Sequence, residues 1–170
     1  MSATTLNAPV LTAEEMLAWN ERTAQTWRQL VDEHPEVLAL PCDIYGVQNV
    51  AQLLQHVVAV ETRYMQRLAG IAETPYDAIP CDTSAGIFGA HEAAMQGMRR
   101  ELAKGGDWDA KFEFQTLSMG RCRASRKTVF FHALMHSIRH YAQLATLVRQ
   151  HGFKPAYPMD YLMMGIEPVD

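Results

Sequence analysis

Three histidines recur at a regular interval near the end of the chain, within the stretch Val129–His151. His132, His136 and His140 each follow the previous one by four residues. On an α-helix, residues four apart lie on the same face, one turn above the other. Two imidazoles at that spacing are a standard way for one helix to hold a metal ion. The spacing therefore predicts metal ligands, against the plainer alternative of histidines on a partly buried or solvated face.

The length of this row limits how many of the three histidines one ion can use. His132 and His140 are separated by about 12 Å along the helix axis, at about 1.5 Å per residue. One ion therefore takes at most one adjacent pair. His136 belongs to either pair, and the spacing alone leaves both pairs open.

The elements that must position these residues are predicted to be four helices. Polar residues start the first, third and fourth, Pro35 and Pro41 frame the exit of the first, and glycines follow the other three. They run from Thr12 to about Glu33, from about Val47 to Leu68, from Thr83 or Ser84 to about Ala103, and from Ser125 to about His151. Residues 1–11 are expected to form a loose arm, 111–117 an extended ribbon, and 153–170 a tail that packs back across the helices. Arg121, Arg123, Arg126 and Lys127 are interpreted as a solvated entry to the last helix. One long cross-connection then makes a single all-α four-helix bundle over residues 1–170.

The second predicted helix carries one histidine at the border of its apolar stripe. His56 follows Leu53 by three residues and precedes Val60 by four. A lone histidine there is usually a boundary residue, but a second histidine set on another helix favours a ligand role. His56 with two histidines of the last helix would leave one coordination position open, as in catalytic zinc sites. Imidazole suits zinc, nickel, iron or copper, so ligand type alone does not select the metal; zinc or nickel is the leading expectation.

Three segments resemble the DinB-like family of metal-binding four-helix bundles. Family members often carry a histidine, a second one four residues later, a His-His-Arg-Gly-Gln run and a Leu-Arg-x-x-Gly ending. HALMHSIRHYAQLATLVRQHG, aligned on His136, keeps the histidines and the helix end, while Arg139, Tyr141 and Ala142 depart from the pattern. VAQLLQHVVAVE, at residues 50–61, resembles the family's second helix, and GFKPAYPMDY, at 152–161, resembles its tail.

The resemblance implies an up-down-down-up bundle and a ligand set. It implies that His56, His136 and His140 form the metal triad and that His132 is a nearby pocket or second-sphere group. Glu61 and Tyr64 are candidate auxiliary groups, although Glu61, five residues after His56, is expected to face solvent. His91 is followed by Glu92 but not by a second histidine at the HExxH spacing, so it is not a candidate ligand.

The resemblance also implies a function. Family members with assigned activities include metal-dependent transferases that use low-molecular-weight thiols and a thiol-dependent maleylpyruvate isomerase. The leading hypothesis is therefore a divalent-metal site that activates a thiol or water for transfer to a small electrophile. The alternative is a non-catalytic helical bundle with a structural metal or a binding partner. Relatives are often dimers, so we expect a homodimer; no catalytic side chain is assigned.

Composition excludes several other classes. The formal net charge of −4 argues against the basic face that nucleic-acid binding requires. The cysteines are odd in number and far apart, at Cys42, Cys81 and Cys122, which favours a reducing compartment over a disulfide scaffold. No apolar run reaches membrane-spanning length, and the first residues lack the order of a signal peptide. We expect a cytoplasmic protein without a membrane partner.

Overall fold

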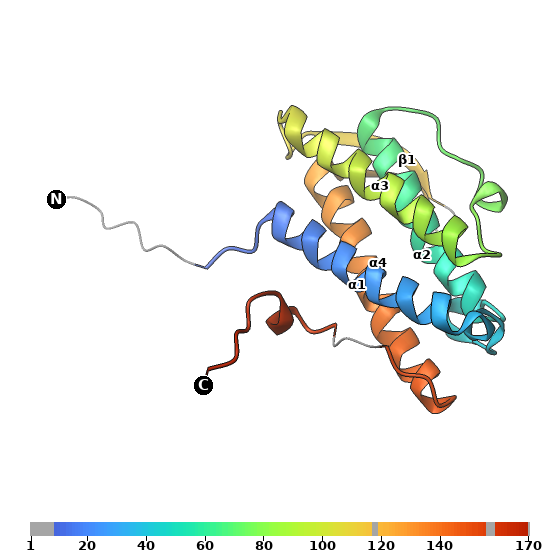
Figure 1. Ribbon diagram of the computed structural model, residues 1–170. Coiled ribbons are helices and arrows are strands. Elements are labelled where there is room, and N and C mark those ends of the chain that lie inside the picture. Colours follow the sequence, from blue (N-terminus) through green and yellow to red (C-terminus); the bar gives the residue numbers. More distant parts are fainter. Residues whose placement is uncertain (1–8, 117–118, 156–158, 170) are drawn as a thin grey trace.

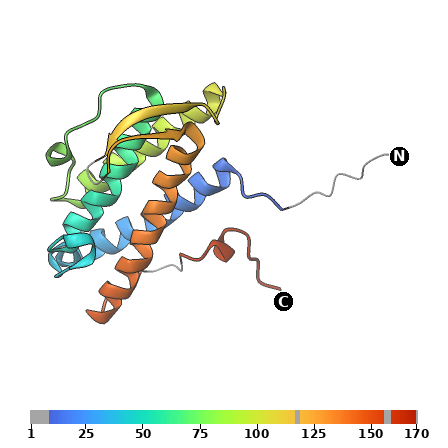
Figure 2. The same ribbon diagram turned by 180° about the vertical axis from the view of Figure 1, so that it is seen from behind.

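Four helices form one bundle in the computed structural model, which describes residues 9–116, 119–155 and 159–169. Within these ranges the α-helices are α1 (Ala13–Glu33), α2 (Val50–Ala69), α3 (Ser84–Lys104) and α4 (Arg126–Gln150). Figure 1 shows α2 and α3 pointing one way and α1 and α4 the other, the expected up-down-down-up arrangement, and Figure 2 shows α4 from the opposite side. Helix α2 packs against both α3 and α4, so it connects these two helices.

The caps explain where the helices begin and end. Thr12 and Glu15 form the predicted capping box at the start of α1. Gly70 ends α2 in the left-handed conformation, with φ of 68°. The prediction that α2 starts at Val47 is three residues too early. The chain first makes a 3-10 turn at Ile44–Gly46 and a bridge between Pro41 and Asn49, and Asn49 then caps the helix by accepting from the backbone of Gln52.

The all-α prediction is wrong for the segment before α4, where a β-hairpin forms. Strand β1 (Lys111–Thr116) pairs antiparallel with β2 (Gly120–Ser125). The extended ribbon at 111–116 is thus confirmed, and Leu117 lies outside the described residues. The interpretation of the four basic residues as a helix entry is correct for Arg126 and Lys127, which begin α4, and wrong for Arg121 and Arg123, which lie on β2. Arg121 and Arg123 both form ion pairs with Glu113 on the opposite strand.

The apolar interior is divided into two clusters with polar side chains between them. One cluster surrounds Trp27, Val57 and Tyr141, and the other surrounds Met95 and Phe130. The buried polar residues at the bundle centre are Asn20, Glu61, His91, Ser137 and the histidines of α4 at positions 136 and 140. Buried polar groups need hydrogen-bond partners. The pairing of these side chains across helices therefore determines which helix faces pack together.

The described part of the tail packs back on α1, as predicted. The indole nitrogen of Trp19 donates to the carbonyl of Met159 at 2.9 Å, and the ring of Tyr161 meets that indole edge-on. The tail carries a short 3-10 helix at Tyr161–Met164; two more lie at Pro35–Ala39 and Tyr76–Ala78. Most of the predicted N-terminal arm lies outside the described residues. Within the described ranges, the helices lack the length and apolarity of a membrane span.

Candidate metal centre

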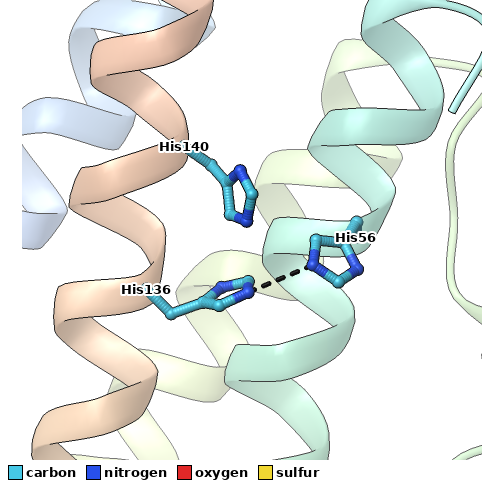
Figure 3. Close-up of side chains that lie close together, drawn as sticks. All are labelled: His56, His136 and His140. Carbon is cyan, nitrogen blue, oxygen red and sulfur yellow. Dashed lines mark hydrogen bonds between the residues drawn. The ribbon is translucent and has the colours of Figure 1, made fainter. Parts of the chain in front are cut away.

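Three histidines from two helices converge at one point of the bundle. Helix α2 supplies His56, and α4 supplies His136 and His140, whose rings all point into the space between the two helices (Figure 3). Nε2 of His56 lies 3.1 Å from Nε2 of His136. One ring nitrogen from each residue falls within 4.8 Å of the others, so the group could hold a metal ion. The sequence spacing brought two of them to one face, and helix packing adds the third.

The surroundings keep these imidazoles in the neutral form that binds metals. Burial, with the neighbouring charges of His140 and Arg139, lowers the pKa of His56 to about 4. Burial and the adjacent histidines lower the pKa of His136 to about 2. Burial and then the charge of Arg139 also lower the pKa of His140. Neutral imidazole is the ligand form, so no proton competes with a cation at pH 7.

The residues present fit a divalent cation. A tetrahedral ion with ligands at 2.0–2.1 Å requires nitrogens about 3.3 Å apart, and the 3.1 Å separation of His56 and His136 is close to that value. Nitrogen ligands from imidazole match zinc, nickel, copper or iron. The outer Nδ1 atoms of His136 and His140 are buried without a hydrogen-bond partner among the described residues. Nε2 of His140 lies 3.1 Å from the guanidinium of Arg139, so an ion bound through that atom would displace this contact.

The alternative pair of His132 with His136 is less convergent. His132 is exposed and packs edge-on against Tyr64, with ring centroids 5.1 Å apart. Its ring centroid lies 5.6 Å from that of His136, against 4.5 Å between His136 and His140. His132 and Tyr64 both line the cavity beside the centre. They are placed as pocket groups and not as members of the converging set.

The expectation that Glu61 faces solvent is wrong. Its side chain is fully buried and bonds two other helices. The carboxylate accepts from Oγ of Ser137 at 2.6 Å and lies 2.8 Å from Nδ1 of His91. Helical spacing could have predicted that Glu61 is buried, because it lies three residues after Val58 and seven before Leu68, on the buried face of α2.

His91, which the motif spacing excludes as a ligand, is a buried partner of that carboxylate. Burial lowers the pKa of His91, but the charge and hydrogen bond of Glu61 outweigh it and the net pKa is raised. The residue lies on α3 between Ile87 and Met95, both buried, so helical spacing indicated burial. Its partner lies thirty positions away in the chain, at a distance that spacing rules do not cover.

A cavity of about 350 Å³ opens beside the histidines, on the side of His56 and His136. Tyr45 lines its rim and stacks on His56, with ring centroids 4.5 Å apart. The backbone of Tyr45 has φ of 58°, which is costly for a tyrosine and often found where a side chain must be aimed at a site. The sequence indicated a turn at this position but not its role against His56.

The fold and the site together define a helical bundle whose two long helices present a three-histidine group able to hold a metal ion. The sequence matches the model of the DinB family over residues 1–166, and the chain belongs to that family. No curated protein matches the chain. Family membership confirms the resemblance seen in the separate motifs.

Proposed function

We propose that this protein is a divalent-metal-dependent enzyme that activates a thiol or water for transfer to a small electrophile. The observation that carries the proposal is the convergence of His56, His136 and His140 beside a cavity of about 350 Å³. Three protein ligands leave a coordination position for an exogenous group, whereas structural zinc is normally closed by four. The cavity is of the size that small-molecule sites have.

The chain's own residues would divide the work. His56, His136 and His140 would hold the ion, with zinc or nickel foremost and iron or copper as alternatives. A bound divalent ion lowers the pKa of coordinated water to about 7, or stabilises a bound thiolate. Tyr45 and Tyr64 flank the cavity and would orient the organic reactant against the histidines. Glu61 does not line the cavity; it supports α4 through Ser137, beside His136.

Metal content tests the ligand set. Protein purified without a histidine tag should bind about one divalent ion per chain, measured by mass spectrometry of the native protein. His56→Ala, His136→Ala and His140→Ala should each lose it, with circular dichroism unchanged. His151→Ala, at the exposed end of α4, is the matched control and should keep the ion. If His132→Ala loses the ion and His140→Ala keeps it, the other histidine pair is the correct one.

A non-catalytic role is the competing proposal, favoured by the way the histidines join α2 to α4. An ion held there would cross-link two helices and stabilise the fold whether or not anything reacts. Thiol-transfer assays on the metal-replete protein separate the two roles. Turnover that His136→Ala abolishes supports the enzyme, and loss of stability without any turnover supports the structural role.

We further propose a cytoplasmic homodimer without nucleic-acid partners, from charge, cysteine usage and family resemblance. Light scattering measures the oligomeric state.

A further inference from the structure

The wall of the cavity beside the three histidines carries three arginines, two of which are already paired. Glu73 binds Arg67 through both carboxylate oxygens, at 2.7 and 2.9 Å. The same carboxylate lies 2.8 Å from the guanidinium of Arg63. Arg67 also donates to the carbonyl of Gln115 and lies over the ring of Tyr64. Arg63 and Arg67 are thus committed to holding the cavity wall together.

Arg139 lines the same cavity and differs from the other two. No carboxylate of the described residues lies within ion-pair distance of it, and its side-chain contact is with Nε2 of His140, at 3.1 Å. Arg139 is an uncompensated positive charge beside a candidate cation site.

Cation binding at Nε2 of His140 would remove the hydrogen bond that joins this residue to Arg139. His140 offers a single lone pair at Nε2, so it cannot both accept from Arg139 and coordinate an ion through that atom. Arg139 is exposed and lines the cavity, so a guanidinium displaced from His140 can turn toward a ligand in that cavity. A planar guanidinium matches a carboxylate through two parallel hydrogen bonds, and that pairing would also offset the local excess of charge.

We propose, building on the metal-dependent function above, that Arg139 binds a carboxylate of the reactant and makes the cavity selective for small carboxylic acids. The carboxylate belongs either to the thiol or to the electrophile that the thiol attacks. The volume of about 350 Å³ limits the reactant to a small molecule.

The test uses matched small thiols with and without a carboxylate. Metal content is measured first, and the protein is then loaded with cobalt so that thiolate binding is read from its absorption band. If the thiol carries the carboxylate, wild-type protein should bind 3-mercaptopropionate about tenfold more tightly than 2-mercaptoethanol, the size of effect that one charge-assisted hydrogen bond provides. Arg139→Gln should bring the ratio of the two affinities close to one, whatever its effect on thiolate binding itself, while Arg139→Lys should retain part of the preference. Arg149→Gln, a matched arginine on the same helix whose guanidinium donates to the carbonyl of Ala145 one turn earlier, should behave as wild type.

A second arm asks which reactant carries the carboxylate. Succinate and succinamide are titrated, with 2-mercaptoethanol saturating, and binding is followed by calorimetry. An Arg139-dependent preference for succinate assigns the carboxylate to the electrophile, and one for mercaptopropionate assigns it to the thiol. Metal-replete protein that shows neither preference, or keeps it in Arg139→Gln, overturns the inference and leaves the metal-dependent function standing. Protein that holds no ion in the first measurement instead overturns the proposed function.

Discussion

At the scale of single residues, Glu61 is the buried side chain that links α2 to two other helices. One carboxylate on α2 holds Ser137 of α4 and His91 of α3, so three helices meet at two oxygen atoms. The hydroxyl of Tyr141 and Nε2 of His91 are buried without partners among the described residues. Such a layer stabilises the fold only when its members are satisfied, because a buried polar group without a partner is costly.

Removing that carboxylate should be among the most damaging single changes in the protein. Glu61→Ala leaves Nδ1 of His91 and Oγ of Ser137 without their shared partner, and breaking a buried pair costs about 3–5 kcal/mol. Urea denaturation should show this loss in the free energy of unfolding. Glu36→Ala, at an exposed glutamate on the short helix after α1, should remain close to wild type. Equal effects of the two substitutions would show that the Glu61 network contributes little.

At the scale of elements, α2 and α3 approach each other closely where α3 has a glycine. A Cβ added at Gly97 would lie 2.5 Å from Sδ and 2.6 Å from Cγ of Met65 on α2. Gly97 therefore permits a contact that no larger residue allows without displacing Met65. A Cβ added at Gly89, also on α3, would meet no atom within 4 Å among the described residues.

These two glycines make a matched pair for measuring helix packing. Gly97→Ala should destabilise the protein, because overpacking costs about 1–3 kcal/mol and outweighs the gain in helix propensity of about 1 kcal/mol. Gly89→Ala carries the same gain without the clash and should stabilise the protein. Thermal unfolding of both variants gives the comparison. A higher melting temperature for Gly97→Ala would mean that Met65 moves aside freely.

At the scale of the whole molecule, the candidate metal centre joins α2 to α4 across the bundle. An ion that binds the folded chain and not the unfolded one stabilises it by about 2.7 kcal/mol at a hundredfold excess over its dissociation constant. Chelation should therefore lower the melting temperature of wild-type protein, and re-addition of the ion should restore it. His136→Ala should melt at the same temperature with and without chelator. A wild-type melting temperature that chelation does not change would contradict binding at this centre.

Much of this molecule follows from local sequence rules. Helix starts at Thr12, Thr83 and Ser125 follow from side chains that cap free backbone groups, which is a matter of neighbouring residues. The row of histidines on α4 follows from the helical repeat alone. Local rules miss the start of α2 at Asn49 and the second strand at 120–125, because a bridge and a cross-strand ion pair involve partners outside the local pattern.

The sequence by itself determined that His136 shares a face with either neighbour, and family resemblance pointed to His140 and His56. Only the packing of α2 on α4 brings those three rings together and leaves His132 against Tyr64. Tertiary structure likewise decided that Glu61 is buried with His91 and that Arg139 has no carboxylate partner among the described residues. The physical reason is range: helical spacing relates residues within a few turns, whereas these contacts form only when separate helices pack.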